Sequence, residues 1–185
     1  NDVAGLDVQL VRLENKNGSL SNSGYFRVTG TLIPEVTSSV FSTLYTNDRW
    51  NISFRIKPQT YPFAGSLSGT LTPSYNVYFS GYNAISDTIV NQFSITSSIN
   101  HFSGQSFLTS SKRFYLGADR QDFTGSVQTS SSAKATSLRL WMTYLEDNTL
   151  KAHAKDPTNY GVKSLMSNAY TTNSGSTYAQ NTAIV

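Results

Sequence analysis

The sequence predicts an all-β protein, an antiparallel β-sandwich or jelly roll with one short helix near residues 147–155. Apolar and polar residues alternate with a period of two, most clearly in 50–57, where the large apolar residues occupy every even position. Clusters of Gly, Asn, Ser and Pro separate such stretches at spacings near those of short strands. The 14% charged residues and 12% aromatic residues fit neither a helical bundle nor a disordered chain.

The expected strands follow one another along most of the chain. Each combines alternation with β-favouring residues, and turn clusters at 15–23, 58–73 and 130–135 interrupt the series. The alternating segments are 6–13, 25–33, 50–57, 76–82, 88–97, 105–109, 113–116, 125–128 and 137–143.

The expected helix begins after an acidic pair and ends before a proline. Asp147 or Asn148 can cap its N-terminus, the last turn carries lysines, and Pro157 prevents continuation. Residues 1–165 are expected to form a single β-sandwich domain, and the polar residues 166–185 a C-terminal arm or linker. The chain starts with Asn rather than Met, which favours a processed product or a piece of a longer polypeptide.

Composition excludes several kinds of site. Without cysteine there are no disulfides and no cysteine-ligated zinc or iron–sulfur centres. The net charge of +3 comes from scattered Lys and Arg, with only Lys112-Arg113 adjacent, so no basic stripe for nucleic acid is expected. No apolar run is long enough to span a membrane.

Four segments in series resemble one family. Residues 50–58 (WNISFRIKP), 114–119 (FYLGAD), 123–127 (FTGSV) and 138–150 (LRLWMTYLEDNTL) are similar in order and spacing to motifs of laminin-G-like, concanavalin-A-like jelly-roll domains. The likeness covers roughly residues 25–155. The continuation 151–161 (KAHAKDPTNYG) resembles the ending of such domains in structural proteins of tailed phages and other viruses.

This resemblance implies a non-enzymatic structural or adhesion protein of a virion, located at the virion surface and associated with a capsid, fibre or tail. Its partners would be other virion proteins, copies of itself or a host-surface glycan. The alternative is a carbohydrate-binding, lectin-like module of a larger secreted or surface protein.

Some concanavalin-A-like domains are glycoside hydrolases, which need two carboxylates about 5–10 Å apart. None of the glutamates, Glu14, Glu35 and Glu146, has an acidic residue two positions away on the same strand face. Of the two histidines, His101 is expected in a turn, and His153 as a cation favoured by the dipole at the helix C-terminus. We therefore expect no enzyme activity and no required cofactor.

Two ligand sites remain as alternatives to ordinary structural roles. Asp119 and Asp122 could offer carboxylates to Ca²⁺, or could serve the backbone of their own turn. The densest tyrosine cluster could stack against sugar rings, or could form cross-strand packing. The candidate carbohydrate-binding residues in that cluster are Tyr75, Tyr78, Tyr82 and Asn83.

Overall fold

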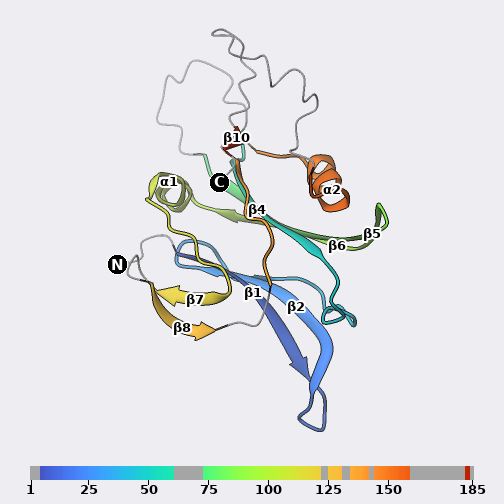
Figure 1. Cartoon of the computed structure of the whole chain (residues 1–185). Coiled ribbons are helices and arrows are strands. Elements are labelled where there is room, and N and C mark those ends of the chain that lie inside the picture. Colours follow the sequence, from blue (N-terminus) through green and yellow to red (C-terminus); the bar gives the residue numbers. More distant parts are fainter. Residues whose placement is uncertain are drawn as a thin grey trace, which may run out of the picture.

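The described part of the chain folds into antiparallel β-sheets with two short helices. The structure, a computed structural model, describes residues 5–60, 73–121, 125–130, 134–141, 144–158 and 182–183. One sheet has the order β1-β2-β3 and a second the order β4-β5-β6, and two further pairs are β7-β8 and β9-β10 (Figure 1). The strands are β1 (Leu6–Glu14), β2 (Leu20–Gly30), β3 (Val36–Thr37), β4 (Trp50–Pro58), β5 (Tyr75–Ile85), β6 (Thr88–Ile99), β7 (Ala118–Gln121), β8 (Ser126–Ser130), β9 (Leu140–Trp141) and β10 (Thr182–Ala183).

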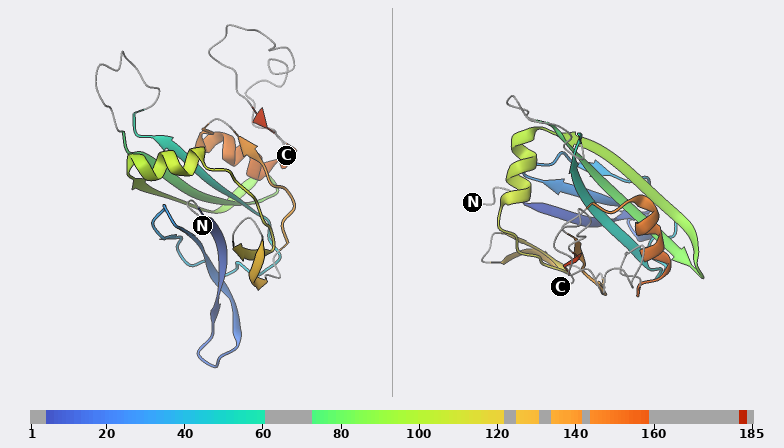
Figure 2. Two further views of the ribbon diagram at one scale, coloured as in Figure 1. Left: turned by 90° about the vertical axis from the view of Figure 1, so that its left-hand side faces the viewer. Right: turned by 90° about the horizontal axis from the view of Figure 1, so that it is seen from above.

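The two three-stranded sheets share a core. Phe26 and Val28 of β2 contact Phe79 of β5 and Phe93 of β6, and all four are at most 8% exposed. The ring centroids of Phe26 and Phe93 lie 5.3 Å apart, and those of Phe79 and Phe93 lie 4.9 Å apart. Aromatic rings bury large apolar areas and dominate core energetics. Figure 2 shows the β1-β2 ribbon below the β4-β5-β6 sheet, α2 above that sheet, and α1 along one of its ends.

The alternation in β4 is confirmed. Trp50 and Ile52 pack against the shared core, whereas Arg55 lies on the opposite face of the sheet. The strand pairs in continuous register with β5, from Trp50 opposite Asn83 to Pro58 opposite Tyr75. Its polar residues are therefore lined up on the outer face, away from β1-β2-β3.

The expected strand at 105–109 is wrong, because these residues form the second half of helix α1 (His101–Thr109). Asn100 caps the helix by accepting a hydrogen bond from the Ser103 N–H at 2.9 Å. Buried Phe107 packs its ring against Phe54, with centroids 5.7 Å apart. His101, expected in a turn, is the first residue of this helix.

The expected helix near residues 147–155 is confirmed as α2 (Asp147–Lys155), but its cap is not the one predicted. Glu146 occupies the N-cap position and makes no side-chain capping bond. The helix lies over the outer face of β5 (Figures 1 and 2). Its Leu150 and Ala154 pack against Tyr82. The β4-β5-β6 sheet is thus covered on both faces along part of β5.

Other strand predictions are only partly met. Residues 126–128 of the expected strand 125–128 lie in β8, the described residues of 137–143 include only the two-residue β9, and 113–116 form no strand. Alternation indicates which faces a strand would have, but not whether a neighbouring strand is available to pair with it. The predicted arm 166–185 lies outside the described residues except Thr182–Ala183, which pair as β10 with β9. Neither helix in the described parts of the chain is long and apolar enough to cross a membrane.

Candidate functional site

Three of the four candidate carbohydrate-binding residues are buried. Tyr75 is 6% exposed, Tyr82 is 2% exposed, and Asn83 is fully buried. Tyr75 lies under α1, where it contacts Gly104, and Tyr82 lies under α2. Asn83 donates from Nδ2 to the Arg49 carbonyl oxygen at 3.0 Å, so its amide holds the start of β4. These three side chains are part of the packed interior, and neither tyrosine has a ring face open to a sugar.

Tyr78 is the exception, because it lies half-buried on the outer face of β5. Its ring meets that of Tyr144 edge-on, with centroids 5.4 Å apart. The Lys57 Nζ lies 4.0 Å from the centroid of the Tyr144 ring. Asn76 donates from Nδ2 to the Tyr78 hydroxyl oxygen at 3.3 Å, and its own Oδ1 accepts from Gln59 at 3.2 Å. We call Lys57, Asn76, Tyr78 and Tyr144 the outer-face cluster.

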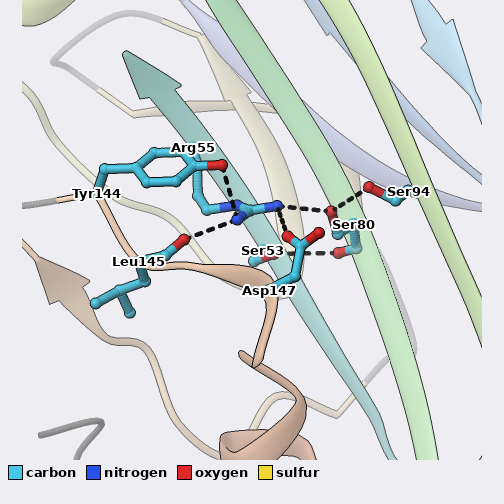
Figure 3. Close-up of polar contacts among 7 residues, drawn as sticks. All are labelled: Ser53, Arg55, Ser80, Ser94, Tyr144, Leu145 and Asp147. Carbon is cyan, nitrogen blue, oxygen red and sulfur yellow. Dashed lines mark hydrogen bonds and ion pairs between the residues drawn. The ribbon is translucent and has the colours of Figure 1, made fainter. Parts of the chain in front are cut away.

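Beneath this cluster lies Arg55, a buried cation on β4 whose side chain is 6% exposed. Nη1 donates to the Leu145 carbonyl oxygen at 2.7 Å and to the Tyr144 hydroxyl at 3.1 Å (Figure 3). Nη2 donates to Ser80 Oγ at 3.1 Å and forms an ion pair with Asp147 Oδ1 at 2.6 Å. The guanidinium thus joins the middle of the sheet to the start of α2.

The arginine contacts extend across all three strands of the sheet. Ser80 Oγ shares a hydrogen bond of 3.2 Å with Ser94 Oγ on β6, and Ser53 Oγ on β4 donates to the Ser80 carbonyl oxygen at 3.4 Å (Figure 3). The buried Nε of Arg55 makes no hydrogen bond within the described part of the chain. Because an arginine stays charged, its N–H donors hold neighbouring oxygens in place, and the group does not act as a general acid or base.

The tyrosine hydroxyl at this site is a poor acid. Burial raises the pKa of Tyr144 to about 12, and the nearby Arg55 opposes that shift. The hydroxyl therefore stays protonated at neutral pH and accepts the bond from Arg55. Chemically, the outer-face cluster offers two aromatic rings, an ammonium and an amide, which are groups suited to binding rather than to proton transfer.

The candidate calcium residues are only partly described. Asp119 lies on β7 opposite Thr129, and Asp122 lies outside the described residues. Among the residues that the structure does describe, no group of three or more His, Asp or Glu could hold a metal ion. Whether Asp119 and Asp122 bind Ca²⁺ stays a prediction.

The two histidines have different environments. His101 Nδ1 lies 3.2 Å from the Pro73 carbonyl oxygen. His153 is 3% exposed, an environment that disfavours the helix C-terminal cation expected from the sequence. The reason is its position on the inner side of α2, where the ring stacks on Trp141.

Arg55, Tyr144 and Asp147 were not singled out from the sequence as site residues. Arg55 alternates with the apolar residues of β4, which places it on the outer face but does not reveal that α2 covers that face. Comparison with known proteins gave no matching protein-family model, no matching curated protein and no matching solved structure. Any functional proposal therefore depends on the chain's own sequence and geometry.

Proposed function

We propose that this chain is a virion structural or adhesion domain, a laminin-G-like jelly roll that acts through contact with copies of itself and with other virion proteins. Its location would be the virion surface, and its action would be association rather than catalysis. The support comes from the order of its elements and from the surface of one edge strand.

The four family-like segments correspond to structural elements in the same order. Residues 50–58 coincide with β4, 114–119 lead into β7, 123–127 reach β8, and 138–150 contain β9 and the start of α2. Two antiparallel sheets that face each other across a core are compatible with a jelly roll. These features support the family resemblance but do not identify a partner.

The observation that carries the proposal is the apolar surface of β1. This strand lies at the edge of its sheet, and within the described residues only β2 pairs with it. Val8 is 49% exposed and Leu10 is 37% exposed, although they lie opposite the buried Val28 and Phe26. Directly opposite residues of an antiparallel pair share a face. The apolar inner face of the sheet therefore continues onto an edge strand that the rest of the described chain leaves half uncovered.

A second copy of the chain fits this edge. Antiparallel pairing of β1 with β1 of another copy about a two-fold axis at Gln9 would place each Val8 opposite the other copy's Leu10. All four apolar side chains would then lie on one face of a continuous sheet. Unpaired edge strands are templates for such pairing.

Native mass spectrometry of the purified chain tests this proposal. The wild type is expected to form dimers or larger assemblies, and Val8→Lys is expected to be monomeric, because a charge would be buried at the new sheet contact. Val90→Lys is the matched control, since Val90 is 47% exposed on the edge strand of the other sheet. A wild-type chain that is monomeric and is absent from purified virus particles would refute the proposal.

A second candidate function, carbohydrate binding, is favoured by the outer-face cluster. Sugar recognition uses aromatic rings for the apolar ring faces and polar groups for the hydroxyls. Tyr78 and Tyr144 supply rings, and Asn76 and Lys57 supply polar groups next to them. In this proposal the chain is a lectin-like module of a secreted or surface protein, or a virion domain that binds a host glycan.

A glycan array, followed by titration of any hit, tests the second candidate. Binding should be lost in Tyr78→Ala and retained in Tyr115→Ala, which removes a comparable half-exposed tyrosine from the segment before β7. Running the array with Ca²⁺ and with EDTA also tests the role predicted for Asp119 and Asp122. No binding under either condition would exclude this candidate.

A further inference from the structure

His153 is buried between α2 and β9 in an environment suited to a neutral ring. The residue is 3% exposed, and its imidazole stacks on the Trp141 indole with centroids 5.2 Å apart and an interplanar angle of 26°. The buried Nε2 has no hydrogen-bond partner among the described residues. Protonation would place a charge on this ring with no partner for its Nε2–H in the described part of the chain, and burying such a charge is costly.

The charged groups around this end of α2 are mostly cations. From the chain before β9, Arg139 reaches the Pro157 carbonyl oxygen, and Arg49 at the start of β4 donates to the Ala154 carbonyl oxygen at 2.8 Å. From α2 itself come Lys151 and Lys155, and among the described residues Asp156 at the C-cap brings a carboxylate to this end of the helix.

The sheet beneath α2 offers His153 no carboxylate in the described contacts. β5 contributes the Tyr82 phenol, whose ring centre lies 5.9 Å from Lys151 Nζ, and β6 contributes the apolar Ile89. Asp156 is engaged by Thr158, through N–H at 2.8 Å and the hydroxyl at 2.6 Å. A second positive charge beside Arg139 would therefore be repelled more than it is neutralised.

We propose that α2 is an acid-released latch, in which protonation of His153 detaches the C-terminal half of the helix from the β4-β5-β6 sheet. The helix N-terminus is held separately by Arg55, through Asp147 and the Leu145 carbonyl. Release of the other end would uncover Tyr82 and Ala154, which are each 2% exposed when the helix is docked. Mild acid would thus turn a closed outer face into an apolar surface.

The direction of the pH effect follows from the neutral state of the ring. Burial lowers the pKa of His153 below its ordinary value of 6.5, and the charge of Arg139 lowers it further. The docked helix therefore binds fewer protons than the released helix. Its stability is fully present above pH 6.5 and is lost as the pH falls from 6.5 to the lowered pKa of the docked state. Over that range, the ratio of released to docked helix rises about tenfold per pH unit.

Hydrogen exchange of the α2 amides in the full chain tests the latch. The exchange rates are corrected for the intrinsic pH dependence of exchange. Between pH 7 and pH 5, protection of residues 151–155 should fall once the pH drops below 6.5, by up to about tenfold per unit until the lowered pKa of the docked state is reached. His153→Phe keeps an aromatic ring against Trp141 and should remove this pH dependence. His101→Gln, which changes the other histidine, should retain it.

NMR titration of the wild-type imidazoles gives an independent measurement, which applies even if His153→Phe does not fold. The His153 resonances should titrate below pH 6.5, together with the loss of α2 protection. Titration of His153 near 6.5 with α2 protection unchanged, or the same pH dependence in His153→Phe as in the wild type, would overturn the proposal.

Discussion

Arg55 shows how one buried cation can position a distant segment of the chain. Its guanidinium contacts an oxygen of Ser80 on β5 and oxygens of three residues at or just before the start of α2, namely Tyr144, Leu145 and Asp147. Tyr144 and Leu145 are 89 and 90 residues away in the sequence. We expect the contacts to contribute unequally to stability, because the Asp147 side chain is 55% exposed whereas the hydrogen bonds to Leu145 and Ser80 are buried. Exposed ion pairs contribute little, and buried hydrogen bonds contribute more.

Substitution of Arg55 should therefore cost much more than substitution of its ionic partner. Arg55→Met keeps the apolar stem, leaves the Leu145 carbonyl and Ser80 hydroxyl without their donor, and should lower the free energy of unfolding by about 2–4 kcal/mol. Asp147→Asn should lower it by less than about 1 kcal/mol. Urea unfolding of the two variants measures both values, and equal losses would show that the ion pair dominates.

The raised pKa of Tyr144 predicts how the free energy of unfolding changes at alkaline pH. Because burial raises its pKa to about 12 in the folded chain, the hydroxyl's stabilising contribution is present below the ordinary value of 10.0 and is lost as the pH rises through about 12. The free energy of unfolding should fall between these two values. Tyr144→Phe should reduce that slope while lowering stability at neutral pH, where the bond from Arg55 is lost. An unchanged alkaline slope in the variant would show that other groups cause it.

At the scale of elements, α1 shows where sequence alternation misleads. Residues 105–109 alternate like a strand, but the decisive features are an Asn cap before them and a glycine that allows close contact. A Cβ added at Gly104 would lie 2.2 Å from Tyr75 Cδ2. The helix therefore forms because it packs against a ring that is distant in sequence, which no local pattern reveals.

Gly104→Ala should destabilise the chain even though alanine favours helices. The added methyl must displace the Tyr75 ring, and overpacking of this kind costs about 1–3 kcal/mol, more than the helix propensity gained. Gln105→Ala, at an exposed position of the same helix, should be neutral or slightly stabilising. Thermal unfolding compares the two, and a stabilising Gly104→Ala would contradict the packing described for α1.

The same reasoning explains why alternation predicts the two faces of β4 but not the burial of Tyr75, Tyr82 and Asn83 in β5. Both strands alternate, and in β4 the predicted faces are found, with Ile52 inward and Arg55 outward. In β5, alternation predicts that one face is open, but α1 and α2 together with the second sheet bury Tyr75, Tyr82 and Asn83. Period-two patterning specifies faces, whereas covering of both faces depends on tertiary contacts.

At the scale of the whole molecule, the two large sheets cover each other incompletely. Their shared core is closed around β2, β5 and β6, while the inner face of β1 extends past it with Val8 and Leu10 exposed. Exposed apolar edges are uncommon in chains that act alone, because they pair readily with other strands. We therefore propose that this edge is a contact surface between copies of the chain.

Hydrogen exchange measured at low and high protein concentration tests that claim most directly. If β1 pairs with β1 of a second copy, the amides of residues 6–14 should exchange more slowly at high concentration, with little change in β6, the edge of the other sheet. Val8→Lys should abolish the difference. Exchange in β1 that is independent of concentration in the wild type, under conditions where assemblies are present, would contradict the claim.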